Sequence, residues 1–190
     1  MNEEHKKNSH CSYCGTRFTE QVLWPRKCFR CYNDSWSNPL PVVCMLYNVW
    51  ESNHLGTLIQ QRNIEPKKGE WALTGGYIDE GESWREAAVR EAREELGLET
   101  VPEGYAVLDV TSNTSKNNIL IFVSHIRALH LDEIKFTPNE EVQAVKIIHE
   151  YMELAFPTHT EMLARRFPSH LKELMPVPPP YELGMTKRML

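Results

Sequence analysis

The sequence lacks any apolar stretch near the length needed to span a bilayer, and its first ten residues contain no apolar core of a secretory signal. Acidic Glu3 and Glu4 also argue against a transit peptide. Basic residues are not in excess, since 21 Lys and Arg against 26 Asp and Glu give a net charge of −5. These absences argue against a dedicated nucleic-acid or membrane surface. We expect a cytoplasmic protein with no membrane partner.

The chain has 190 residues, 41% of them hydrophobic, which is enough for one ordinary core and a small additional unit. Four of its five cysteines form two Cys-x2-Cys pairs with thirteen residues between the pairs: Cys11, Cys14, Cys28 and Cys31. This pattern is typical of a tetrahedral zinc site. Two disulfides or a redox pair are the alternatives, but a reducing setting and the lack of a surrounding βαβ pattern disfavour them. Because four protein ligands leave no open position, we expect this zinc to be structural.

The zinc-binding unit is only weakly basic. Residues 1–41 contain six Lys and Arg against four Asp and Glu, a balance of +2. That excess is too small for the electrostatic footprint of a nucleic-acid-binding module, so nucleic acid is not an expected partner. The unit is expected instead to cap the rest of the chain or to take part in a dimer contact.

The most informative segment is GYIDEGESWREAAVREAREELGL, residues 76–98, with the spacing G-x5-E-x7-R-E-U-x-E-E-x-G-U, where U is apolar. Residues 83–96 favour a helix because they contain neither Gly nor Pro. Glu91, Glu94 and Glu95 are spaced i, i+3 and i+4, which places three carboxylates on one side of that helix. A solvated acidic face is the alternative for an arbitrary helix. The preceding Gly-rich loop and the complete spacing favour a metal site instead.

This segment resembles the Nudix box, and the chain is similar to Nudix hydrolases, which cleave nucleoside diphosphates linked to another moiety with a divalent metal. Carboxylate oxygens suit Mg²⁺ or Mn²⁺. The resemblance implies that Glu91 and Glu95 are direct ligands and that Glu94 is a ligand or lies just outside them. The backbone carbonyl of Gly75 is the further implied ligand. Glu82 is implied to hold the cluster through water or hydrogen bonds.

Two further residues complete the expected catalytic group of Glu91, Glu94 and Glu95. Arg90 is expected to pair with and orient a glutamate of the box, because its charge would otherwise oppose the metals. Many Nudix enzymes take their general base from a glutamate on a later loop, where this sequence has Glu140 and Glu141. Two solvated loop glutamates are the alternative, which the sequence leaves open; Glu141 is the candidate retained here.

The resemblance implies an α+β fold, the Nudix α/β/α sandwich with a mixed β-sheet, preceded by a small N-terminal zinc ribbon. The expected units are the zinc ribbon at 8–36, the Nudix domain at 40–168 and a Pro-rich C-terminal tail at 169–190. Alternation and β-branched residues predict further strands, and these are 42–50, 56–62, 105–112, 118–128 and 141–148. C-terminal helical segments are expected at 161–167 and 171–175.

Four motifs extend the likeness to a zinc-ribbon branch of the family: CSYCG, NPLPVV, QRNIEPKKGEWALTGGYIDEGE and ELAFPTHTEML. This branch includes ADP-ribose pyrophosphatase-like proteins and a plant FAD pyrophosphatase. One departure is Thr74, where the loop usually has Pro. The common substrate tags are missing, since no SQPWPFPxS-type element follows the box. Thr114 and Lys116 occupy the places of the Pro and Tyr that mark ADP-ribose and dinucleoside-polyphosphate enzymes.

Three residues are candidate substrate contacts. Arg62, at the end of a strand, could contact a phosphate or base, although a solvated charge is its default interpretation. Trp71 could stack a base, although an aromatic residue there is more often part of the core. Gly76 permits a tight backbone path beside the substrate.

The expected function is Mg²⁺- or Mn²⁺-dependent hydrolysis of a pyrophosphate bond, with FAD or ADP-ribose as substrate and AMP as one product. A homodimer is expected from the family resemblance. One alternative is a non-catalytic Nudix-fold nucleotide sensor, which the intact box glutamates disfavour. The other is an NADH or NAD-capped-RNA pyrophosphatase; the missing SQPWPFPxS-type element disfavours the NADH enzyme, and the acidic charge balance disfavours the RNA enzyme.

Overall fold

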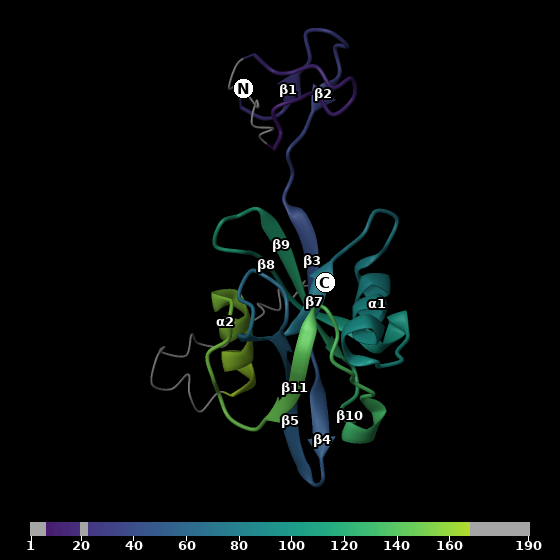
Figure 1. The fold of residues 1–190 in the computed structure, drawn as a ribbon. Helices are drawn as coiled ribbons and strands as arrows, with labels where there is room; N and C mark the ends of the chain where they lie inside the picture. Colours follow the sequence, from purple (N-terminus) through teal and green to yellow (C-terminus); the bar gives the residue numbers. More distant parts are fainter. Residues whose placement is uncertain (1–6, 20–22, 168–190) are drawn as a thin grey trace, which may run out of the picture.

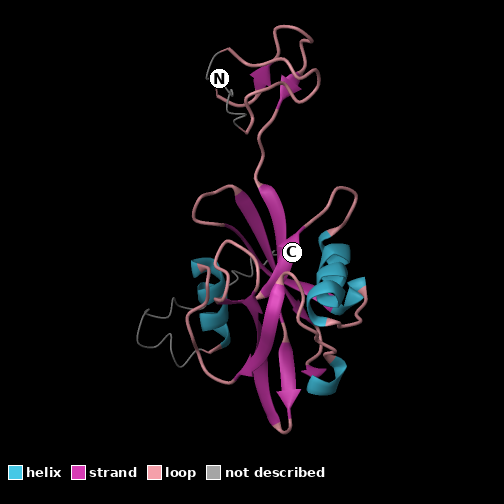
Figure 2. Ribbon diagram, viewed as in Figure 1, coloured by secondary structure: helices cyan, strands magenta, loops and turns pink. Residues whose placement is uncertain are grey.

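The structure is a computed structural model that describes residues 7–19 and 23–167 (Figure 1). The predicted tail at 169–190 and the predicted helical segment at 171–175 lie outside these residues. Within them, the strands form a two-stranded ribbon hairpin and two larger sheets (Figure 2).

Two mixed sheets form the centre of the molecule. The first has the order β7-β3-β9-β8, with parallel pairing of β3 and β9. Its strands are β3 (Leu40–Leu46), β7 (Thr74–Tyr77), β8 (Tyr105–Ser112) and β9 (Asn118–His125). The second has the order β10-β4-β5-β11, with β6 beside β5 and parallel pairing of β10 and β4. Its strands are β4 (Asn48–Glu51), β5 (His54–Arg62), β6 (Trp71–Ala72), β10 (Leu129–His130) and β11 (Val142–Ile148).

Helices α1 (Trp84–Leu96) and α2 (Pro157–Arg166) lie on opposite sides of the strands (Figure 1). Alternation along β3 explains this arrangement, because neighbouring side chains of a strand point to opposite faces. Val43 and Met45 pack in the cluster that contains the alanines of α1, whereas Cys44 packs in the cluster that contains Met162 and Leu163 of α2. The α/β/α sandwich and the α+β class are therefore confirmed. No helix in the described part of the chain is long and apolar enough to cross a membrane.

The box helix α1 has a clear start and end signal. Ser83 accepts a hydrogen bond from the backbone of Glu86, and the Glu86 side chain accepts one from the backbone of Ser83, which forms a capping box. Gly97 follows with φ of 62°, the left-handed conformation that glycine adopts without steric cost. These caps fix the rotation and length of the helix that carries the box glutamates.

Several element boundaries differ from the sequence prediction; the strand expected over 118–128, for example, ends at His125. The strand expected over 42–50 is interrupted at Tyr47, because β3 and β4 belong to different sheets and the chain crosses from one to the other there. Buried Tyr47 shares a 2.7 Å hydrogen bond between its hydroxyl and that of Tyr105, which satisfies both groups. The C-terminal helix begins at Pro157, before the predicted 161, because proline is well tolerated in the first helical turn.

The N-terminal unit stands apart from the sandwich and is joined to it by an extended segment (Figure 1). It contains the short antiparallel strands β1 (Arg26–Lys27) and β2 (Asp34–Ser35). Among the described residues from 7 to 36, only Cys11, Cys28 and Ser35 are buried. This small apolar interior cannot by itself hold a fold of this size, so the unit needs an additional cross-link.

Candidate active site and zinc centre

Three carboxylates from two separate segments meet beside the box helix. Glu91 and Glu95 come from α1, and Glu141 comes from the loop that ends at β11. One oxygen of each lies within 4.8 Å of the others. Glu91 and Glu95 are buried, whereas Glu141 is exposed. We call these three residues the carboxylate trio; its exposed member leaves it open to solvent on one side.

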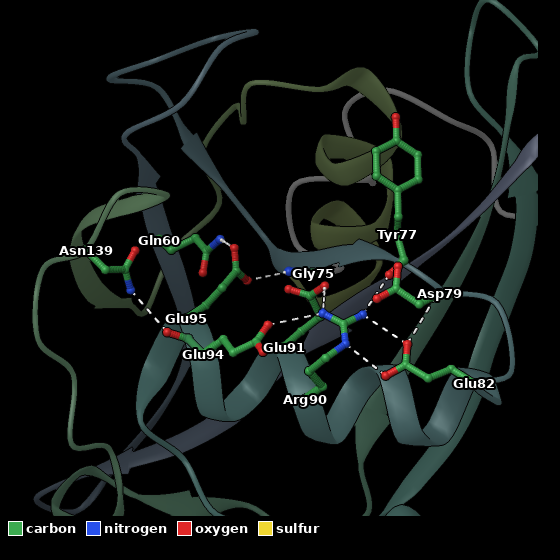
Figure 3. A network of polar contacts seen from close by, with 10 residues as sticks. All are labelled: Gln60, Gly75, Tyr77, Asp79, Glu82, Arg90, Glu91, Glu94, Glu95 and Asn139. Atoms are coloured by element: carbon green, nitrogen blue, oxygen red, sulfur yellow. Dashed lines mark hydrogen bonds and ion pairs between the residues drawn. The ribbon is translucent and has the colours of Figure 1, made fainter.

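Glu95 is the most deeply held member of the trio. Its Oε1 accepts a 2.7 Å hydrogen bond from Nε2 of Gln60, and its Oε2 accepts a 2.8 Å bond from the backbone N–H of Gly75 (Figure 3). Burial raises the pKa of Glu95 to about 8, helped by the charges of Glu91 and Glu141, although the bonds from Gln60 and Gly75 lower it. The pKa of Glu91 is likewise raised, first by burial. Protein groups alone therefore do not balance the negative charge here.

A divalent cation fits this site on structural grounds. The buried carbonyl oxygen Oε1 of Gln60 has no hydrogen-bond partner among the described residues, while its Nε2 is fixed on Glu95. An unpaired buried oxygen beside repelling carboxylates is costly unless a cation or an ordered water completes it. Oxygen-rich donor sets of this kind suit Mg²⁺ and Mn²⁺. Glu91, Glu95 and Glu141 are the residues that would hold the ion.

The segment expected as a Gly-rich loop is part of strand β7, where Gly75 and Gly76 lie so close to their neighbours that side chains would not fit without displacing them. Gly75 has φ of 145°, and a Cβ there would overlap the backbone carbonyl of Val43 on the paired strand β3. A Cβ on Gly76 would overlap the carboxylate of Glu91. Glycine is required at Gly75, where backbone approaches backbone directly, whereas a side chain at Gly76 would have to displace the Glu91 carboxylate. The predicted carbonyl ligand, Gly75, thus lies in the strand that contacts the trio.

Arg90 binds Glu91 of the trio and two carboxylates beside it, those of Glu82 and Glu94 (Figure 3). Its Nη1 donates to Glu91 at 2.6 Å and to Glu94 at 3.2 Å. Its Nε and Nη2 hold both oxygens of Glu82 at 2.8 and 3.1 Å, and Nη2 also donates to the Tyr77 carbonyl. These donated bonds fix the guanidinium on protein groups, as expected of a residue that orients the box glutamates.

The remaining predicted contacts lie outside the trio. The Glu94 side chain is 54% exposed and bonds to Arg90. The Arg62 guanidinium donates to the Pro66 carbonyl at 2.8 Å, so it holds its own loop. Trp71 is half-buried and has the Lys146 ammonium 4.2 Å from its ring centroid. The substrate roles of Arg62, Trp71 and Gly76 and the metal role of Glu94 stay predictions.

Two polar residues at the site were missed by reading the sequence. Gln60 lies on β5 and bonds to Glu95, and Asn139 precedes Glu141 and donates to the Glu94 carbonyl at 3.1 Å (Figure 3). A glutamine within an apolar strand carries no local signal for a partner that is distant in the sequence. Asn139 follows a proline and precedes two glutamates, a turn-forming context in which an asparagine side chain often bonds to the backbone nearby.

The four predicted zinc ligands also converge. Cys11, Cys14, Cys28 and Cys31 form one cluster, and none is in a disulfide. The Sγ atoms of Cys11 and Cys31 are 3.6 Å apart, as are those of Cys14 and Cys28. Tetrahedral coordination with Zn–S bonds of about 2.3 Å requires S···S edges of about 3.8 Å. The cluster could therefore hold zinc with little rearrangement.

Electrostatics in the cysteine cluster also favour a cation. The pKa of Cys11 is lowered to about 6, chiefly by a hydrogen bond from the backbone of Cys14. A backbone bond from Asn33 lowers the pKa of Cys31, but burial and the three neighbouring sulfurs outweigh it and raise that pKa to about 11. Four adjacent thiolates cannot all be charged without a positive ion among them. Zinc binding would supply it and release the remaining thiol protons.

A family model for the NUDIX domain matches residues 38–170, which is more than half of the chain. The chain belongs to the Nudix family. A solved structure of a NUDIX hydrolase from Nitrosomonas europaea superposes with a TM-score of 0.62 at 22% identity, and it covers 86% of this chain and 93% of that one. This likeness supports the fold, including the mixed sheets and two helices described above.

Two curated relatives were also found. An ADP-ribose pyrophosphatase from Methanocaldococcus jannaschii is 31% identical over 105 residues, which are 54% of this chain and 56% of the relative. The NAD-capped RNA hydrolase NudC from Photorhabdus laumondii is 24% identical over 165 residues, 86% of this chain and 60% of the relative. The chain thus spans a little over half the length of the curated relatives it matches.

Proposed function

We propose that this protein hydrolyses the pyrophosphate bond of a nucleoside diphosphate linked to another moiety, with ADP-ribose or FAD as substrate and AMP as one product. The observation that carries this proposal is the convergence of Glu91, Glu95 and Glu141 beside Gly75 and Gly76 of strand β7. Membership of the Nudix family and likeness to an ADP-ribose pyrophosphatase support this assignment.

The geometry supports different roles for the buried and the exposed members of the trio. A bound Mg²⁺ or Mn²⁺ would neutralise the diphosphate and lower the pKa of an attacking water. Buried Glu91 and Glu95 would hold the ion, because Arg90, Gln60 and the Gly75 N–H already fix their carboxylates. Exposed Glu141 would be the third ligand of the same ion, and its carboxylate could also accept a proton from a water bound there. Because the carboxylates of Glu91 and Glu95 are already fixed, little reorganisation is required when charge develops on phosphorus.

The N-terminal unit is proposed to be a structural zinc ribbon at 8–36, separate from a Nudix domain at 40–168. The sulfur spacing, the free cysteines and the small apolar interior support this division. A homodimer remains part of the proposal, with a nucleotide as the small-molecule partner.

Product analysis tests the assignment. Purified protein would be incubated with ADP-ribose, FAD, NADH and NAD-capped RNA in Mg²⁺ or Mn²⁺, with Glu95→Gln as the blank. We expect AMP from ADP-ribose or FAD in the wild type and little in the blank. Preferred release from NAD-capped RNA would instead assign the substrate class of the NudC relative. No hydrolysis in any arm would contradict the enzymatic proposal and favour a nucleotide sensor.

A further inference from the structure

Glu141 reaches the carboxylate trio from a loop, so something other than a helix has to hold it. Its backbone N–H donates to Oδ1 of Asn139 at 2.9 Å, and its carbonyl accepts a bond from the Asn63 N–H at 2.7 Å. Oδ1 of Asn139 also accepts the N–H of Val142 at 2.8 Å. The backbone on both sides of the Glu141 side chain is therefore fixed by two asparagines.

The other end of the Asn139 amide reaches the box helix. Its Nδ2 donates to the Glu94 carbonyl at 3.1 Å (Figure 3). Glu94 lies in the last turn of α1, where carbonyls have no partner within the helix, and the Leu98 N–H bonds to Ala92 instead. One side chain thus links the loop of Glu141 to the turn that carries Glu94 and Glu95.

The amide of asparagine is specifically suited to this link. The oxygen accepts two backbone N–H groups while the nitrogen donates to a backbone carbonyl, so both ends are used. The substitution Asn139→Asp would keep the acceptor but place a charged oxygen against the Glu94 carbonyl. Alanine would lose both ends of the link. The backbone of Asn139 is itself held, since its carbonyl accepts a 2.8 Å bond from the Asn63 side chain.

We propose that Asn139 is a positioning residue that sets the Glu141 carboxylate against Glu91 and Glu95 and thereby tunes the affinity of the trio for a divalent cation. This inference rests on the proposed function, because it requires the trio to bind the ion. It adds a residue outside the trio whose effect passes entirely through Glu141. Losing an outer partner of a metal ligand typically lowers metal affinity about 10- to 100-fold.

A double-mutant cycle on the zinc-loaded, full-length protein tests this inference. Mn²⁺ affinity is measured by electron paramagnetic resonance for the wild type, Asn139→Ala, Glu141→Ala and the double variant, with thermal melting as the check of folding. We expect Asn139→Ala to weaken Mn²⁺ binding about 10-fold or more in the wild-type background. In the Glu141→Ala background the second substitution should change Mn²⁺ affinity by less than about twofold, because effects through one residue are not additive.

Three results would overturn the inference. Equal weakening by Asn139→Ala in both backgrounds would show that it acts on the fold or on another ligand. Wild-type affinity in Glu141→Ala would remove Glu141 from the cation site, while wild-type binding of Mn²⁺ would still support the proposed function. A wild type that binds no Mn²⁺ would end both proposals. Should Asn139→Ala not fold, Asn139→Ser keeps a short acceptor for the Glu141 N–H, lacks the donor to Glu94, and takes its place in the cycle.

Discussion

The cysteine cluster and the carboxylate trio are both sets of acidic groups whose charge a cation would balance, but the structure that supports them differs. The four cysteines lie on tight loops of the N-terminal unit. Of its described residues only three are buried, and its two strands are two residues long each. Two members of the trio, Glu91 and Glu95, lie on a thirteen-residue helix that packs on one of the two hydrophobic clusters of the sandwich. The sulfur set is closed, whereas exposed Glu141 leaves the trio open. From this difference we predict that a cation at the cysteine cluster would support folding and that one at the trio would support catalysis.

Cys28→Ser should produce the largest effect and should affect the ribbon alone. Structural zinc contributes about 10 kcal/mol or more to the folding of isolated zinc-finger peptides, so losing a ligand should abolish zinc binding and unfold the unit. The Nudix domain has its own core and should keep turnover within about threefold, a margin typical of a remote change. Metal analysis, limited proteolysis and AMP release measure the three effects.

Cys44→Ala is the matched control, because Cys44 is buried in the sandwich and lies outside the cysteine cluster. The Cys44→Ala protein should keep its zinc. Normal zinc content in Cys28→Ser would show that the four-sulfur interpretation is wrong, and loss of turnover together with zinc would show that the two units depend on each other.

Glu95→Gln should produce the reverse pattern, with normal zinc and little turnover. Stabilisation of transition-state charge by a metal is worth several kcal/mol, which corresponds to a fall in kcat/KM of about 10³-fold. The glutamine oxygen can accept the bond from the Gly75 N–H, and its amide nitrogen can donate to Gln60 once the Gln60 amide turns to present its oxygen, so the melting temperature should change little. Steady-state kinetics with circular dichroism provide the measurement. A folded variant with nearly normal turnover would remove Glu95 from the site.

Glu94→Gln sharpens the same test. A loss as large as that of Glu95→Gln would support the predicted direct ligand. A loss of about tenfold would fit an outer carboxylate held by Arg90, as its 54% exposure favours.

His159 should make the stability of the sandwich depend on pH. It should not contribute to the stability of the ribbon. It is buried on α2, accepts the Leu73 N–H at Nδ1 and has Nε2 3.5 Å from the Cys44 sulfur. Burial, with the charge of Arg62, lowers its pKa from 6.5 to about 4. The unfolded chain therefore takes up a proton below about pH 6.5 while the folded chain does not, so stability falls as the pH drops from about 6.5 towards 4, by up to about 3 kcal/mol.

Urea denaturation at several pH values, for the wild type and His159→Gln, measures this contribution. The variant cannot titrate at this position, so its stability should decrease less over the same interval. Parallel pH curves for the two proteins would show that His159 does not supply the dependence.

Gly76→Ala should leave folding and zinc unchanged and affect only the trio. The added Cβ would displace the Glu91 carboxylate, and we expect Mn²⁺ affinity to fall about 10- to 100-fold. Gly81→Ala is the control: Gly81 lies in the loop before α1, and its Cβ would meet no atom within 4 Å, although its φ of 89° adds strain. Calorimetric Mn²⁺ titration distinguishes them. Equal Mn²⁺ affinity in both variants would show that a contact between the added Cβ and the Glu91 carboxylate does not weaken ion binding.

The sequence predicted those parts of both sites whose spacing is local. Helical spacing placed Glu91 and Glu95 together on α1, and the paired Cys-x2-Cys motifs located the sulfur cluster. Their neighbouring residues share one helix or one tight loop, so their geometry follows from the chain itself. The capping box of α1 is another local signal that the structure contains.

Contacts between distant segments could not be predicted in this way. Periodicity does not show that Gln60 reaches Glu95, that Asn139 reaches the Glu94 carbonyl, or that Glu141 joins the trio and Glu140 does not. Each depends on the register of β5 and β11 against the helix, which the packing of the whole sandwich sets. The break at Tyr47 has the same origin, because a continuous apolar run does not reveal a change of sheet.

The most direct test of the central claim measures AMP release from ADP-ribose and FAD while Mn²⁺ is titrated into zinc-loaded protein freed of other divalent ions. The account predicts no release without Mn²⁺, saturating activation as Mn²⁺ is added, and loss of that activation in Glu95→Gln with zinc content unchanged. Release that is independent of Mn²⁺, or activation that survives in folded Glu95→Gln, would contradict a cation held by Glu91, Glu95 and Glu141.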